Sequence, residues 1–279
     1  MKKIITFLFL PATLAVYAQP KVLTQATITT KTIIVAPEED ENVQTNTAGP
    51  GGEEVRIMRF GGDGETKTTT WLKNNMTKTF SESEMGRTTV FRDNNKKLTT
   101  TIMEMMGRKT GFYATDEDQA EMRKRMDSMM RTRAQGAGNT ISNTPPVYRF
   151  EYLEESKKIS GLICKKSLMV GKRSDGRSDT TVVWYCPDFK LQGLPSTGGF
   201  GGFNQVTGID GMEGLNGFPV QYERNMRNGR KMTVEVTKIV IDKDVSDKEF
   251  DIPKDIEIKP MKDMQNGGGP GMQIRIGGH

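Results

Sequence analysis

Short segments rich in threonine and β-branched residues, separated by turn residues, dominate this chain. Residues 21–35 read KVLTQATITTKTIIV, which is typical of a β-strand with partial alternation of apolar and polar positions. Gly, Asn and Asp clusters separate the segments that follow, as expected for tight turns. This close, regular spacing predicts consecutive antiparallel strands in a curved sheet or barrel. The predicted strands cover residues 55–60, 67–73, 76–83, 88–92, 98–106, 147–153, 161–170, 179–186, 219–224 and 231–241.

One strongly helical segment interrupts the strands. Thr115 is a suitable N-cap, and residues 116–118 place three acidic side chains in the first turn, where the helix dipole favours them. The helix is predicted to run to about Gln135. Its methionines follow one stripe, which predicts an apolar ridge packed against the sheet. They are Met122, Met126, Met129 and Met130.

The first 18 residues have the pattern of a secretory signal peptide. Two lysines precede an apolar run that is shorter than the roughly 20 residues of a membrane span, and Val16-Tyr17-Ala18 suits a cleavage site. Cleavage after Ala18 is therefore expected, the alternative being an uncleaved anchor. Residues 19–262 then form a single β domain with surface loops at 37–54 and 193–217. Residues 263–279 form a flexible Gly-rich tail.

The two cysteines lie on adjacent predicted strands. Cys164 and Cys186 are each eleven residues from a turn centred on Asp175, so a hairpin folded there places them opposite one another. Opposed residues in an antiparallel pair are close enough for a disulfide, and an exported protein favours one. The spacing predicts a structural disulfide, with two buried free thiols as the alternative.

Charge and composition exclude several classes of function. The formal net charge of +5 comes from basic and acidic residues that are interspersed, which is not the pattern of a nucleic-acid-binding protein. The only histidine is His279, near the end of the chain, so a histidine general base and most zinc-enzyme ligand sets are excluded. Carboxylate chemistry remains as an alternative, but no Asp or Glu pair stands out. We expect a protein that is not an enzyme and needs no cofactor or metal.

Methionine is unusually frequent, with 18 residues in the chain. Met103 and Met105 add to the methionines of the predicted helix. Three interpretations remain open: filler of a core, the adaptable wall of a ligand cavity, or thioether ligands of copper(I). The cavity interpretation makes these six methionines the candidate ligand-lining residues.

Several motifs together resemble the DUF4412 family. They are the hairpin segments 68–76, 86–97 and 106–113, the strand Ile159–Lys166 with its G-x-x-C-K-K pattern, and the ending Asp247–Pro253 with its D-x-x-F-x-I-P pattern. That ending is also similar to lipoprotein-carrier (LolA/LolB-like) proteins. Residues 214–220, GLNGFPV, resemble the GLPGLI families of Bacteroidota, with Asn216 in place of the proline and Phe218-Pro219 in place of Leu-Ile.

The resemblance implies a mainly β (α+β) fold, a curved and incompletely closed antiparallel half-barrel with an amphipathic helix against its concave face. We expect an exported protein of the periplasm or outer-membrane periphery of a Gram-negative bacterium. The preferred function is non-enzymatic binding of an apolar ligand, such as a lipid or acyl chain, in the half-barrel. The alternative is a structural or protein-interaction module of the envelope with a filled core. No nucleic-acid partner and no transmembrane segment are expected.

Overall fold

The computed structural model describes residues 19–35, 64–84, 86–136, 147–172, 178–192, 212–226 and 229–266. The predicted signal peptide, the predicted strand 55–60 and the loop 37–54 lie outside the described residues. So do residues 193–211 of the Gly-rich loop and residues 267–279 of the predicted tail.

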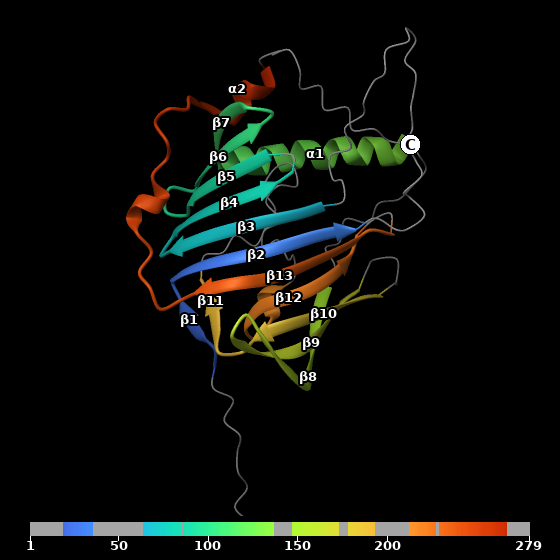
Figure 1. The fold of residues 1–279 in the computed structure, drawn as a ribbon. Helices are drawn as coiled ribbons and strands as arrows, with labels where there is room; N and C mark the ends of the chain where they lie inside the picture. The colour runs from blue at the N-terminus through green and yellow to red at the C-terminus, as the bar shows by residue number, and fades with distance from the viewer. Residues whose placement is uncertain are drawn as a thin grey trace, which may run out of the picture.

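The chain forms one large open sheet with few helices (Figure 1). Twelve strands pair in the order β14-β7-β6-β5-β4-β3-β2-β13-β12-β10-β9-β8. All neighbouring pairs are antiparallel except β14 and β7, which are parallel. The strands of this sheet are β2 (Gln25–Val35), β3 (Gly64–Lys73), β4 (Met76–Ser83), β5 (Gly86–Asp93), β6 (Leu98–Met105), β7 (Arg108–Thr115), β8 (Val147–Ile159), β9 (Leu162–Lys172), β10 (Ser178–Cys186), β12 (Phe218–Asn225), β13 (Lys231–Val240) and β14 (Ile258–Pro260).

The short strands β1 (Lys21–Leu23) and β11 (Phe189–Leu191) form a separate parallel pair. The remaining elements are α1 (Asp116–Gly136), α2 (Met261–Asn266) and the 3-10 turns η3 (Met212–Gly214) and η5 (Asp247–Phe250).

The predicted fold class is confirmed, because the protein is mostly β and its sheet is open rather than closed into a barrel. Strands β3 to β7 follow one another along the chain and pair in that order, and we call this part of the sheet the meander. Strands β11 and β14 were not predicted, and β7 was predicted only as part of the hairpin segment 106–113. A two-residue turn at Met106-Gly107, both with positive φ, connects β6 to β7. Gly111 lies in β7 against the Ile258 side chain of β14, and a glycine within a strand weakens its sequence pattern.

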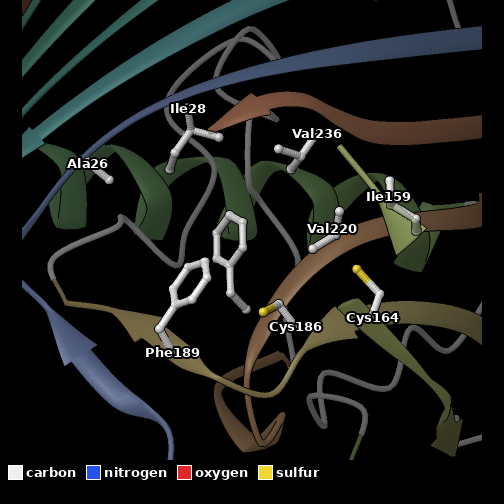
Figure 2. Close-up of a cluster of buried hydrophobic side chains, with 9 residues drawn as sticks. Ala26, Ile28, Ile159, Cys164, Cys186, Phe189, Val220 and Val236 are labelled. Atoms are coloured by element: carbon white, nitrogen blue, oxygen red, sulfur yellow. The ribbon is translucent and has the colours of Figure 1, made fainter. Parts of the chain in front are cut away.

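The sheet is strongly curved, and one of its faces is concave. Ile28 of β2, Cys164 of β9 and Ile159 of β8 belong to one buried apolar cluster, although three strands separate β2 from β9 in the sheet. Val236 of β13, Val220 of β12 and Cys186 of β10 connect them strand by strand, and the curvature of the sheet itself is seen in Figure 1. Figure 2 shows members of this cluster pointing toward one another from several strands.

Helix α1 confirms the predicted helix and is tied to the concave side by its first turn. Thr115 caps it, since the Asp118 amide donates to the Thr115 hydroxyl (3.1 Å) and the Thr115 amide donates back to the Asp118 carboxylate (2.9 Å). The Arg92 guanidinium holds both carboxylate oxygens of Asp116, and the Gln119 side chain donates to Thr99. Arg92 and Thr99 are paired on the sheet face that also carries Ile28. Figure 1 shows α1 running behind the sheet at the level of β5 and β6.

The segment after β13 crosses the opposite, convex face. Lys73 of β3 binds Asp247 (2.9 Å) and donates to the Val245 carbonyl (2.7 Å), and Lys78 of β4 binds Glu249 (3.0 Å). The Lys78 ammonium also lies 4.7 Å from the centre of the Trp71 ring. These lysines use long apolar stems to cover the sheet while their ammonium groups hold the C-terminal segment.

The first turn of α1 gives a prediction about pH. The Arg92 guanidinium lowers the pKa of Asp116, and the hydrogen bond from the Thr115 amide lowers the pKa of Asp118. A carboxylate with a lowered pKa in the folded state stabilises the fold above its unfolded pKa of about 4, and this contribution is lost as pH falls through the lower folded value. Asp116→Asn should therefore lower stability by about 0.5–1 kcal/mol at pH 7 and have little effect near pH 2.

Thermal unfolding of the wild type and of Asp116→Asn at both pH values measures this difference. Glu117→Gln is the matched control, because Glu117 is exposed in the same helical turn. Equal losses of stability in the two variants would show that the negative charge of the first turn, and not the contact with Arg92, causes the destabilisation.

Candidate functional site

The concave face of the meander is lined mainly by hydroxyl groups. The strand register places Thr30 and Thr68 opposite each other, and the same row continues through Ser81 and Thr88. We call the Thr and Ser residues of this face in β2–β7 the hydroxyl half. They are Thr30, Thr32, Thr66, Thr68, Thr70, Thr77, Thr79, Ser81, Ser83, Thr88, Thr99, Thr101 and Thr110.

Many of these hydroxyl groups are buried and paired with one another. The Thr68 hydroxyl lies 3.1 Å from that of Ser81, and the Thr70 hydroxyl lies 3.3 Å from that of Thr79. Thr68 is 1% exposed. Threonine suits such a surface because its methyl group packs against apolar groups while its hydroxyl hydrogen-bonds along the sheet.

The rest of the concave face carries most of the large apolar side chains, together with Ser167, Thr181 and Arg224. We call the large apolar side chains of β8–β10, β12 and β13 on this face the apolar half. They are Tyr148, Phe150, Tyr152, Met169, Val183, Tyr185, Val220, Tyr222, Met232, Val234 and Val236. Neither of the two core clusters contains a residue of β3–β7, although Leu72 and Val90 of these strands are buried on the same face.

Leu215, after η3, fills part of the apolar half. It is 1% exposed and packs in one cluster with Tyr222 and Val183. The Tyr152 hydroxyl holds the segment in place by accepting from the Asn216 amide (2.9 Å) and donating to the Gly214 carbonyl (3.4 Å). Residues 212–217 lie in the predicted surface loop 193–217, but this part of it is anchored in the core. Its short GLNG sequence lacks the periodicity that signals a buried element.

Tyr222 lies in the middle of the concave face with its hydroxyl group buried. The residue is 5% exposed, and burial raises the pKa of its phenol above the usual value. The hydroxyl oxygen has no hydrogen-bond partner within the described part of the chain, and the same holds for Thr30. Neither residue stands out in the sequence, because a tyrosine or threonine in a strand looks the same whether or not its hydroxyl is paired.

The candidate methionines are distributed unevenly around this face. Met103 and Met105 lie on the concave side of β6 and are half-buried, and Met122 of α1 is half-buried too. Met129 is 67% exposed, so this part of the predicted ridge is not packed on the sheet. The side chains of Met126 and Met130 lie outside the described residues. Ligand contact by any of these methionines stays a prediction.

The two cysteines lie where the hairpin analysis placed them. The β9–β10 register pairs Tyr185 with Lys165, so continuing it by one residue sets Cys186 opposite Cys164. Both are buried free thiols in the structure, so the disulfide predicted from the spacing is not formed there. Burial raises the pKa of the Cys164 thiol to about 11, which leaves it unreactive at neutral pH (Figure 2).

Other candidate chemistry among the described residues is sparse. They include no group of three or more acidic, His or Cys side chains able to hold a metal ion. A shallow surface pocket of about 280 Å³ lies at the turns between β4 and β5 and between β6 and β7, where Glu82, Arg87 and Glu104 line it. Glu82 and Arg87 pair with each other there. No helix in the described ranges is long and apolar enough to cross a membrane.

Thiol labelling tests the state of the cysteines. Because both thiols are buried and burial raises their pKa values, folded protein at pH 8 should react negligibly with dithionitrobenzoate. Unfolding in guanidinium without reductant should then release two reactive thiols. Absence of any thiol after unfolding would instead support the disulfide that the sequence predicts for an exported chain.

Comparison with known proteins adds a family and several distant structures. No curated protein matches the chain. Two crystal forms of PNGF-II are similar at 15% and 16% identity, with TM-scores of 0.36 and 0.35. They cover 87% and 89% of this chain, which spans about a third (32% and 33%) of theirs.

Two further structures are similar at 7% identity. MucB has a TM-score of 0.37, with 83% of this chain and 58% of MucB covered. A putative outer membrane lipoprotein-sorting protein domain from Vibrio parahaemolyticus has a TM-score of 0.26, with 81% and 89% covered. These similarities are too distant to carry an argument about function. Residues 58–256 match the family described as "Domain of unknown function (DUF4412)", and this match covers most of the chain. The chain therefore belongs to the DUF4412 family.

Proposed function

We propose that this protein is an exported, non-enzymatic envelope protein that binds an apolar ligand, such as a lipid or acyl chain, against its concave face. The ligand lies on the meander, over β3–β7, and α1 flanks it. The concave side chains that support this placement are Val90, Met103, Phe112 and the methyl groups of the hydroxyl half.

The observation that carries the proposal is the uneven filling of the concave face. The large side chains of the two core clusters occupy the apolar half, and Leu215 packs among them. The meander contributes mostly hydroxyl side chains to the same face, together with Leu72, Val90, Met103 and Phe112, and no member of either cluster. A concave surface with short side chains and intervening methyl groups suits an elongated apolar molecule.

A second candidate is supported by the part of the core that Leu215 fills. If the whole concave face is filled in the same way, the protein is a structural or protein-interaction module without a ligand. The exposed Met129 and the exposed Arg123, Lys124 and Arg125 of α1 then provide a surface for a protein partner.

A bulky substitution on the concave face separates the two candidates. Thr101 of β6 is half-buried on this face between Val90 and Phe112, so Thr101→Phe occupies the proposed ligand position. If a ligand lies there, the variant should fold normally and lose its lipid. If protein already fills the space, it should lose about 1–3 kcal/mol of stability through overpacking.

Native mass spectrometry of protein purified from an envelope fraction without detergent measures the bound mass, and urea unfolding measures stability. Thr89→Phe is the matched control, because Thr89 is half-buried on the convex face of β5. A wild-type protein with no bound mass, together with a destabilised Thr101→Phe, would contradict the ligand proposal.

Export gives an independent prediction. Expression of the full chain in a Gram-negative host should yield a mature protein that begins at Gln19, because the apolar run is short and small residues precede the cut. N-terminal sequencing of protein from the periplasmic fraction checks this. Retention of Met1 in the membrane fraction would support an uncleaved anchor instead.

A further inference from the structure

Two buried hydroxyl groups on the concave face have no partner in the described part of the chain. They are the Tyr222 phenol on β12 and the Thr30 hydroxyl on β2, whose residues are 5% and 3% exposed. A buried polar group without a hydrogen bond destabilises a fold, and such groups are rare in proteins. Each of them therefore requires an explanation.

Both groups lie where the two halves of the concave face meet. Strand β13 separates β12 from β2, and its residues Val234 and Val236 pair with Tyr222 and Thr30, respectively, on the concave side. Two strand spacings across the sheet and two residues along it separate the backbones of Tyr222 and Thr30, a distance of about 12 Å. Tyr222 belongs to the apolar half and Thr30 to the hydroxyl half, so the unpaired hydroxyl groups mark the boundary between them.

Other buried hydroxyl groups of this face find partners within the protein. The Thr68 hydroxyl pairs with that of Ser81, and the Ser167 hydroxyl donates to the Glu151 carbonyl at 3.1 Å. Buried hydroxyl groups in chemically similar positions thus form hydrogen bonds with neighbouring protein groups. Tyr222 and Thr30 differ from them in having both burial and unused hydrogen-bonding capacity at one boundary.

We propose that Tyr222 and Thr30 bind an oxygen atom of the ligand's head group, so that the ligand is a single-chain lipid with one hydrogen-bonding end. This inference rests on the proposed function and deepens it. The two hydroxyl groups donate to the head-group oxygen or accept from its proton, while the chain lies over the meander. The ligand class is then a long-chain alcohol, ester or fatty acid rather than a pure hydrocarbon.

Two isosteric substitutions test the role of the hydroxyl groups. Tyr222→Phe and Thr30→Val each remove one hydroxyl and keep the shape of the side chain. Because neither hydroxyl is paired within the described protein, both variants should fold with an unchanged or higher melting temperature. Tyr152→Phe is a positive control for stability and should melt lower, since its hydroxyl makes two hydrogen bonds.

Binding is measured with two probes of equal chain length, dodecane and 1-dodecanol, by displacement of the fluorescent reporter N-phenyl-1-naphthylamine. Each variant should weaken 1-dodecanol binding about three- to tenfold, which is the effect of one lost neutral hydrogen bond, and leave dodecane binding unchanged. Tyr113→Phe is the matched binding control, because Tyr113 lies on the convex face of β7.

The outcomes distinguish this inference from the proposed function. If the wild type binds both probes and the variants bind 1-dodecanol as tightly as the wild type, the head-group site is wrong and the lipid-binding proposal survives. That result would indicate that water satisfies the two hydroxyl groups. If the wild type binds neither probe, both proposals are overturned.

Discussion

The curvature of the sheet is the constraint on which the rest of the structure depends. A sheet of twelve strands has two large faces, and this chain provides few helices to cover them. Bending the sheet allows its own side chains to bury one another, and one buried cluster extends from Ile28 of β2 to Cys164 of β9 across the three strands between them. Apolar burial thereby drives the bend, and the bend creates the concave face.

Burial within the concave face is divided between two kinds of side chain. Valine, methionine and aromatic residues interlock in the apolar half, and Leu215 is inserted among them. Threonine dominates the meander, where hydroxyl groups pair across neighbouring strands. A face filled throughout by large side chains leaves no place for a ligand. This division is therefore the physical basis of the proposed binding function, and the two unpaired hydroxyl groups lie along its boundary.

The convex face and the sheet edges are stabilised in a different way. Lys73 and Lys78 hold the segment after β13 by ion pairs, and Lys78 also lies over the Trp71 ring. The edge strand β8 is interrupted by a register shift between Tyr152 and Ser156, and the other edge, β14, has three residues and ends at Pro260. Bulges, prolines and short strands are common means of preventing edge-to-edge pairing, which matters for a large open sheet.

Local patterns in the sequence determined most of the elements. Threonine-rich segments between turn residues predicted β3 to β6 closely, because both signals act within a few residues. The capping residues predicted α1 to within one residue at each end. Equal spacing from the turn placed Cys164 opposite Cys186, since hairpin register follows from the position of the turn.

Only the tertiary structure decided which residues share the concave face and which of their hydroxyl groups form hydrogen bonds. The pairing of β2 with β13 joins segments about 200 residues apart, and no local pattern encodes it. The burial of Leu215 and the missing partners of Tyr222 and Thr30 likewise depend on strands that meet only after the sheet bends. A methionine stripe predicted an apolar helix face, yet Met129 is exposed, because helical periodicity specifies a face and not what packs against it. Sequence thus determined the strands and turns through short-range chemistry, whereas long-range packing decided the candidate site.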